Sequence, residues 1–325
     1  MSRHVPHCAL HGRPAARVSS TARALALTAS FALSVAAPRA VRAQTLEDAE
    51  LLKPRELNAT IMYGHDTWDQ YWEGSLKRSN GNIGTITTSS MTSTVGYGVT
   101  RRLSMFASLP YVRTEASQGV LHSMEGRQDF TLMAKYRLLD PLIAGRARLK
   151  VLAVGAAGIP TSDYTPDFLP LSIGLHSKTL TARAAAHLQD RTGWFFDGFA
   201  ERMWRGNVTL DRSSYYTNGQ LIESNEVAMP DVAVYRGTVG WQREAWCIPV
   251  GFTHQRTLGG GDIRRQDSPF VSNRVNFTAA HAELMYYLPR LSGLRLDLGA
   301  AHTLSGRNVG QSTTIMTGLT YAFHL

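Results

Sequence analysis

The chain has 325 residues, of which 43% are hydrophobic and 18% charged, and this balance excludes a disordered chain, a collagen-like chain and a disulfide scaffold. Its 34 basic and 25 acidic residues give a net charge of +9, which taken alone suggests nucleic acid as a partner. Six arginines and no acidic residue lie before residue 44, however, so the rest of the chain has 28 basic residues against 25 acidic ones. We therefore expect no nucleic-acid partner.

Residues 1–43 have the order of features found in a secretory signal peptide. A basic, acid-free start precedes the apolar run 24–37, which is followed by Pro38 and by the small-residue pattern Val41-Arg42-Ala43. A basic tail with a short buried helix is the alternative. The pattern predicts cleavage after residue 43 and a mature domain over residues 44–325.

Cys247 is the only cysteine after this segment, so the mature chain cannot form an internal disulfide. A large core or a closed hydrogen-bond network must stabilise it instead. Neither a CxxC nor an HExxH motif is present, and we expect no metal site and no cofactor. No apolar run after the signal reaches the about 18 to 20 residues of a spanning helix.

The mature sequence alternates between apolar and small or polar residues with a period of two, which places them on opposite faces of a strand. In the last segment, for example, Ile315, Leu319 and Phe323 share one face while Thr314 and Thr320 share the other. This pattern predicts twelve strands, at 56–66, 85–99, 103–113, 128–138, 147–159, 178–188, 194–205, 231–242, 245–256, 275–288, 294–304 and 313–325.

The connections between these strands alternate between short turns and mostly long loops. Short turns at one rim and long loops at the other, with an even number of strands, are typical of a bacterial outer-membrane barrel. We therefore predict an all-β fold, a transmembrane antiparallel up-and-down β-barrel of about 12 strands, closed because hydrocarbon leaves no backbone group unsatisfied. A soluble β-sandwich or lipocalin-like barrel is the alternative, but its outer face would be polar. The expected partners are the lipid bilayer, lipopolysaccharide, the barrel-assembly machinery and a small-molecule solute.

Three stretches carry a resemblance to a known family: 95–112 (VGYGVTRRLSMFASLPYV), 129–139 (DFTLMAKYRLL) and 151–164 (VLAVGAAGIPTSDY). They resemble the outer-membrane barrel proteins of the meta-pathway of phenol degradation. The resemblance implies transport or channel activity for aromatic or other hydrophobic compounds. The chain departs from the pattern at Leu325, where an aromatic residue is common at outer-membrane C-termini.

Charged side chains occupy the strand faces opposite the apolar ones, and we predict that they line the barrel interior. This predicted lumen set consists of Lys135, Arg137, Arg148, Lys150, Arg183, Asp197, Glu201, Arg236, His281, Glu283, Arg295 and Asp297. Such a set can form ladders of ion pairs or a polar route for a solute. Glu283 and Arg295 flank the turn 289–293, and we expect them to be cross-strand partners.

The aromatic residues Trp68, Tyr71 and Trp72 fall at the start of a long predicted loop. They are candidates for an extracellular gate or capture patch for apolar solutes, since aromatic rings offer a large contact area. Anchoring at the membrane interface is the alternative interpretation.

An enzymatic role is not expected. Barrel acyl hydrolases carry a His-x-Ser pair on one strand face, whereas His122-Ser123 and His176-Ser177 are adjacent residues that would point to opposite faces. The sequence favours an outer-membrane channel or facilitator for small solutes, aromatic or hydrophobic ones among them. The alternative is a non-conducting outer-membrane surface protein that binds a partner or lipopolysaccharide through its long loops.

Overall fold

The computed structural model describes residues 50–264 and 269–325, and every regular element within these ranges is a β-strand. The predicted signal peptide, residues 1–43, lies outside them. In the described ranges, no helix has the length and apolarity needed to cross a membrane. Twelve long strands confirm the twelve predicted from period-two alternation, with boundaries within a few residues. They are β1 (Glu56–Trp68), β4 (Ile86–Gly98), β5 (Leu103–Ala116), β7 (Phe130–Leu139), β9 (Ala147–Ile159), β10 (Thr179–Asp190), β11 (Trp194–Arg205), β16 (Val232–Arg243), β17 (Trp246–Thr257), β18 (Asn276–Tyr287), β19 (Leu294–Arg307) and β20 (Thr313–His324).

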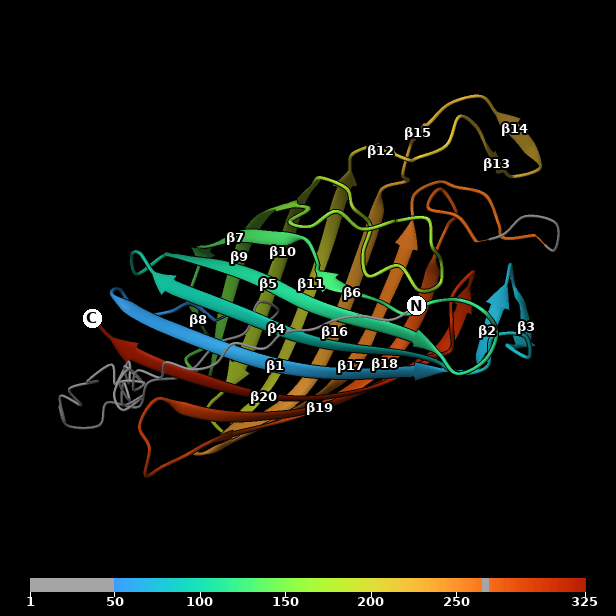
Figure 1. Cartoon of the computed structure of the whole chain (residues 1–325). Helices are drawn as coiled ribbons and strands as arrows, with labels where there is room; N and C mark the ends of the chain where they lie inside the picture. The colour runs from blue at the N-terminus through green and yellow to red at the C-terminus, as the bar shows by residue number, and fades with distance from the viewer. Residues whose placement is uncertain (1–49, 265–268) are drawn as a thin grey trace, which may run out of the picture. The chain divides into compact units, whose positions relative to one another are not determined.

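These twelve strands form one closed barrel (Figure 1). Each long strand pairs antiparallel with the next one along the chain, and β1 pairs with β20 from Glu56 opposite His324 to Thr67 opposite Thr313. Closure gives every long strand a paired neighbour on both sides, which hydrocarbon surroundings require. The prediction of a closed antiparallel barrel of about 12 strands is confirmed, and the closed ladder stabilises a domain whose one cysteine, Cys247, forms no disulfide.

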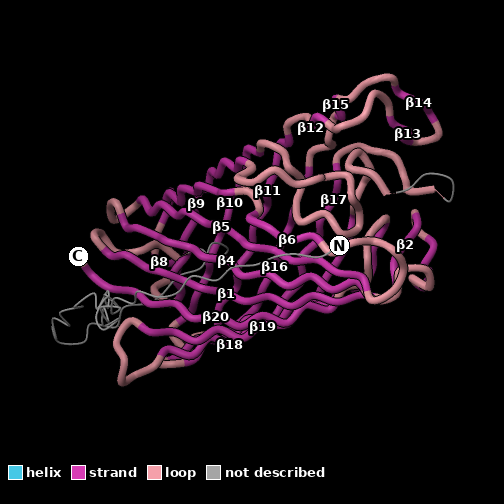
Figure 2. The backbone as a smooth tube through the Cα atoms, viewed as in Figure 1, coloured by secondary structure: helices cyan, strands magenta, loops and turns pink. Residues whose placement is uncertain are grey.

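The connections differ in length between the two rims of the barrel, as predicted (Figure 2). Turns of two to seven residues join the strands at one end, here called the short-turn rim, whereas most connections at the other end, the long-loop rim, are much longer. Short strands decorate these connections: β2 (Gln70–Glu73), β3 (Leu76–Ser79), β6 (Met124–Arg127), β8 (Leu142–Ile143), β12 (Val208–Thr209), β13 (Tyr215–Thr217), β14 (Gln220–Ile222) and β15 (Glu226–Val227).

Side chains alternate along each strand between an apolar exterior face and an interior face that carries apolar, polar and charged groups. On β20, Ile315 and Leu319 are 61% and 46% exposed, whereas Thr320 and Ala322 are buried. Exposed side chains from all around the barrel repeat this pattern, and they include the rim aromatics Tyr111, Trp194 and Trp246. An exposed apolar surface of this extent is unusual for a protein in water, so the exterior matches a lipid environment.

The segment immediately before β1 lies inside the barrel at the short-turn rim. Leu52 is only 1% exposed and packs in the interior apolar cluster of Phe106, Met133, Leu152, Val154, Ala156 and Ala185. The Leu52 backbone N–H donates to Ser104 Oγ at 3.0 Å. Gly98 permits the close approach of this segment, because a Cβ at that position would lie 1.9 Å from the Lys53 carbonyl oxygen. Residues 50–53 therefore fill part of the interior along β5, β7, β9 and β10.

Candidate functional site

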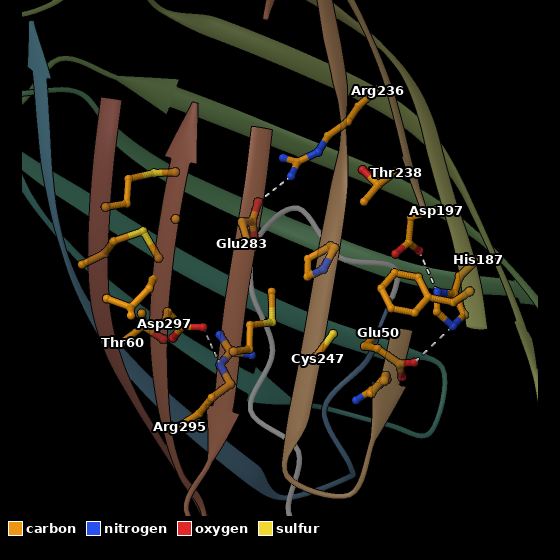
Figure 3. A pocket seen from close by; sticks show the side chains of 18 of the residues that line it. Glu50, Thr60, His187, Asp197, Arg236, Thr238, Cys247, Glu283, Arg295 and Asp297 are labelled. Carbon is orange, nitrogen blue, oxygen red and sulfur yellow. Dashed lines mark hydrogen bonds and ion pairs between the residues drawn. The ribbon is translucent and has the colours of Figure 1, made fainter. Parts of the chain in front are cut away.

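A cavity of about 290 Å³ lies in the barrel interior, and its walls come from Glu50 and from strands β1, β4, β10, β11 and β16 to β20 (Figure 3). Most of its apolar lining residues carry aromatic or sulfur-containing side chains, namely Met62, Phe195, Phe199, Cys247, Met285, Tyr287 and Met316, beside Ala185, Pro249 and Leu298. Methionine side chains are flexible and polarizable, and aromatic rings prefer flat apolar partners. The cavity therefore offers a contact surface for a small apolar or aromatic molecule.

Four charged side chains of the cavity form two pairs of opposite sign. Arg236 Nη2 lies 2.7 Å from Glu283 Oε1, and Arg295 Nε lies 2.8 Å from Asp297 Oδ1. Thr320 lies beside the second pair, with its hydroxyl 3.4 Å from Arg295 Nη2 and 3.3 Å from Asp297 Oδ2. Pairing compensates each charge within the wall, so these groups add polarity to the cavity without a strong local field.

A third charged group forms where the N-terminal segment meets β10 and β11. His187 Nδ1 lies 2.7 Å from Asp197 Oδ1, and its Nε2 lies 4.0 Å from Glu50 Oε1. Glu50 also forms an ion pair with Lys150. The Phe195 ring stacks on His187 with ring centroids 5.5 Å apart. These contacts attach the segment before β1 to the cavity wall.

Ten residues of the predicted lumen set lie on the interior face of the barrel. Asp197, Arg236, Glu283, Arg295 and Asp297 line the cavity. The other five make contacts elsewhere on this face. Lys135 is fully buried, with its Nζ 5.0 Å from the centre of the Phe106 ring, and Arg183 pairs with Glu201 at 2.6 Å. His281 Nε2 lies 3.2 Å from the Thr238 hydroxyl, and Lys150 forms an ion pair with Glu50. Their role in passing a solute remains a proposal.

Arg137 and Arg148 keep the parity of the interior face, but their side chains lie at the short-turn rim and do not line the cavity. The Arg148 side chain is 61% exposed and pairs with Asp140, to which Arg137 also binds at 2.9 Å. Both arginines lie next to the β7 to β9 turn, where β8 and a register shift after Arg137 divert the strands. Arg148 lies opposite Gln189 in the same continuous register that places Lys150 opposite His187, so the face predicted from parity holds and the rim position accounts for the exposure.

The expected cross-strand pairing of Glu283 with Arg295 is wrong. The register places Glu283 opposite Gly299 and Tyr287 opposite Arg295. Glu283 lies four residues farther from the turn than the partner of Arg295, and its carboxylate binds Arg236 of β16 instead.

The aromatic candidates Trp68, Tyr71 and Trp72 pack within the long-loop rim. Trp72 is only 9% exposed, and its ring lies over Gly306, while the Trp68 ring lies over Gly310. The Trp72 backbone N–H donates to the Val309 carbonyl at 2.9 Å. These rings attach the β2–β3 hairpin to the end of β19 and to the 308–312 connection. The structure therefore gives them a packing contact, and a gating role is left as a proposal.

Sequence reasoning missed His187 and the N-terminal residues Glu50 and Leu52. His187 shares the face of Arg183 by parity, and this signal could have identified it. Leu52 precedes the first strand and has no periodic context, so nothing in the local sequence pattern indicates that it enters the barrel.

Asn308 joins three segments of the long-loop rim. This residue has a φ of 55°, a conformation that asparagine tolerates well. Its Oδ1 accepts hydrogen bonds from the backbone N–H groups of Gly74 at 2.7 Å and Ile263 at 3.1 Å. Its Nδ2 donates to Asp262 Oδ1 at 2.9 Å, and Arg307 Nε donates to the same oxygen at 2.7 Å.

Acidification from about pH 4 to pH 2 is expected to weaken the contacts of Asp262 with Arg307 and Asn308 and so to loosen the loop that contains Asp262. The hydrogen bond from Arg307, aided by Asn308, lowers the pKa of Asp262 to about 2. A carboxylate with a lowered pKa stabilises the folded loop above its ordinary pKa, and that stabilisation is lost as the pH falls towards 2. Limited proteolysis of the 258–275 connection with an acid-active protease should show this loss. In Asp262→Asn the loop should be cleaved readily throughout the range, and an unchanged pH profile in that variant would contradict the assignment.

Comparison with solved structures finds a similar fold in an outer-membrane channel. The COG4313 outer membrane channel from Pseudomonas putida F1 aligns with a TM-score of 0.69 and 16% identity, over 86% of this chain and 100% of that one. The translocator domain of autotransporter NalP from Neisseria meningitidis aligns with a TM-score of 0.44 and 13% identity, over 82% of this chain and 88% of that one. The KdgM porin aligns with a TM-score of 0.44 and 7% identity, over 82% of this chain and 99% of that one. No protein-family model matches the sequence, and no curated protein matches it either. The first likeness establishes a shared fold.

Proposed function

We propose that this protein is a bacterial outer-membrane channel or facilitator for small, largely apolar solutes, with aromatic compounds among them. The observation that carries the proposal is a cavity lined by methionine and aromatic side chains inside a closed barrel with an apolar exterior. The signal peptide expected over residues 1–43 supports export, and the exterior suits insertion into lipid by the barrel-assembly machinery, with lipopolysaccharide around the outer rim.

Three physical features select the solute in this proposal. The segment 50–53 narrows the interior at the short-turn rim, so only small molecules pass. The paired charges leave no strong field to attract an ion of one sign. The apolar lining offers dispersion contacts to a flat ring. The sequence resemblance to phenol-degradation barrel proteins agrees with an aromatic solute.

Purified protein in planar bilayers is expected to give small, weakly ion-selective conductance steps, and in liposomes it should pass only small solutes. The narrow interior and the compensated charges are the reasons. Single-channel recording and liposome swelling measure both properties. Arg236→Gln leaves Glu283 unpaired in the cavity, so this variant should become more cation-selective than the parent protein. A folded barrel that passes neither ions nor small solutes would contradict the open-pore version.

A surface-binding protein is the second candidate, because the long loops have an apolar core of their own. This loop core comprises Val208, Leu210, Tyr215, Val227, Met229, Phe270 and Val271. Ordered loops suit recognition of a partner or of lipopolysaccharide. The conductance measurement distinguishes the two candidates, since a binder requires no open lumen.

A further inference from the structure

The short-turn rim carries an excess of basic residues that the long-loop rim lacks. Its residues, 53–56, 99–102, 137–148, 190–193, 243–245 and 288–293, include ten basic and four acidic side chains. The described residues of the long-loop rim, 66–85, 113–129, 160–178, 202–231, 256–264, 269–274 and 307–313, include twelve basic and thirteen acidic ones. The formal charge is therefore +6 at the short-turn rim and −1 at the long-loop rim.

The arginines of the two rims also differ in their partners. At the long-loop rim, five arginines form ion pairs with carboxylates of that rim: Arg78 with Glu73, Arg113 with Glu115, Arg202 with Asp231, Arg212 with Asp167 and Arg307 with Asp262. At the short-turn rim, Arg137 and Arg148 share the one carboxylate of Asp140. Seven other arginines there are exposed and form no ion pair with any residue of 50–264 or 269–325, namely Arg55, Arg101, Arg102, Arg146, Arg191, Arg243 and Arg290.

These seven arginines, here called the arginine ring, are spread around the whole circumference of the barrel. Every turn of the short-turn rim has at least one of them in it or next to it: 99–102, 140–146, 191–193, 244–245 and 288–293. Arg55 adds a sixth position, since it precedes β1, which pairs with β20 and β4. A partner protein would cover one side of such a rim, whereas lipid surrounds a barrel completely. The distribution therefore favours lipid as the partner.

The arginine ring lies just beyond aromatic side chains that face outwards. Arg191 and Arg243 each precede an exposed tryptophan by three residues, Trp194 at the start of β11 and Trp246 at the start of β17. Exposed tryptophan at the end of a barrel strand is typical of the head-group level of a membrane. An arginine one turn farther out is placed to reach lipid phosphate, and its guanidinium group can bind phosphate through two parallel hydrogen bonds.

Two turns of this rim also expose leucine side chains beside an arginine. Leu142 is 60% exposed in the turn that contains Arg146, and Leu291 is 55% exposed next to Arg290. A long apolar side chain at the tip of a turn gains free energy by entering lipid, while the neighbouring guanidinium group stays at the polar surface. Both turns thus combine the two kinds of group that bind a lipid interface.

We propose that the arginine ring is a binding surface for anionic phospholipid head groups. Short turns of outer-membrane barrels face the periplasm, so these lipids belong to the periplasmic leaflet of the membrane. Each basic side chain near an anionic membrane surface adds to the attraction, and a ring of seven therefore prefers lipids with a net negative charge over zwitterionic ones. The inference rests on an exterior that faces lipid, as in the proposed function, but it does not require conductance.

Quenching of tryptophan fluorescence by brominated lipids tests the proposal. All proteins carry Trp204→Phe, so that the exposed tryptophans of the described residues are Trp194 and Trp246, both at the short-turn rim. They are reconstituted in phosphatidylcholine liposomes that contain either brominated phosphatidylglycerol or brominated phosphatidylcholine. Phosphatidylglycerol should bind beside these tryptophans severalfold more tightly than phosphatidylcholine, and the preference should fall as the salt concentration rises.

Two variants with the same change of charge locate the surface. The rim variant replaces one arginine at each turn, as Arg101→Gln, Arg146→Gln, Arg191→Gln, Arg243→Gln and Arg290→Gln. The control variant replaces five exposed basic residues of the long-loop rim, as Lys77→Gln, Arg127→Gln, Lys178→Gln, Arg256→Gln and Arg264→Gln. The rim variant should lose the preference for phosphatidylglycerol, the control variant should keep it, and both should remain folded, heat-modifiable barrels.

Each other outcome has a distinct meaning. Equal quenching by the two lipids in the parent protein would overturn the lipid surface and favour an acidic protein as the partner of the rim, and single-channel conductance in the same protein would leave the channel function standing. A preference that survives in the rim variant, or that is also lost in the control variant, would overturn the assignment to the arginine ring. A parent protein that prefers phosphatidylglycerol but does not conduct would overturn the channel function alone.

Discussion

A protein in which the signal peptide is joined directly to Pro54 is expected to conduct ions severalfold better than the complete mature chain. In the complete chain, residues 50–53 lie inside the barrel, and Leu52 fills the interior between Phe106 and Leu152. Full burial of a leucine side chain contributes about 2 kcal/mol, which is enough to keep the segment inserted most of the time. Its removal empties the interior along β5, β7, β9 and β10 and widens the lumen.

Two substitutions separate the contribution of apolar packing from that of charge. Leu52→Asp places an unpaired carboxylate in an apolar cluster, at a cost of several kcal/mol, and should approach the conductance of the deletion. Glu50→Gln removes the ion pair with Lys150 but keeps Leu52 in place, so its effect should be small. Single-channel recording of the three proteins is the measurement. Equal conductance in the deletion and the complete chain would show that the segment does not limit the pore.

The fold was predictable because every second residue of a barrel strand faces lipid. Each long strand therefore has an apolar pattern with a period of two. Parity assigned Ile315 and Leu319 to the outer face and Thr320 to the inner face, and their exposures agree. The same parity identified buried interior charges such as Lys135 and Arg183, because both share a face with small or polar neighbours. Short turns and long loops then determined which strand ends meet at each rim.

The contacts of the site were not predictable, because parity carries no information on register or on distant segments. The Glu283 carboxylate binds Arg236 two strands away, and neither sequence spacing nor turn length indicates that partner. Arg148 has the predicted parity, but sequence spacing does not show that its end of β9 is exposed at the rim, where Asp140 binds it.

Replacement of Arg295 by methionine is expected to lower the free energy of unfolding by about 3 to 5 kcal/mol. Arg295 is 1% exposed, and its guanidinium lies 2.8 Å from the buried Asp297 carboxylate. Methionine keeps most of the side-chain volume but leaves Asp297 without its countercharge. Removal of one partner of a buried ion pair is costly because the remaining charge is desolvated without compensation. Denaturant unfolding in detergent micelles, monitored by the shift of the heat-modifiable band, measures the loss.

An exposed ion pair and a double variant show whether burial of the Arg295–Asp297 pair causes the expected loss of stability. The Arg202–Asp231 pair has a similar separation of 2.9 Å, but its arginine side chain is 52% exposed, so Arg202→Met should cost only about 0 to 1 kcal/mol. Arg295→Met combined with Asp297→Leu removes both charges and should recover much of the stability, since a buried pair is often replaceable by apolar residues of similar volume. If Arg295→Met and Arg202→Met lower the free energy of unfolding equally, burial of the Arg295–Asp297 pair is not the cause of the loss.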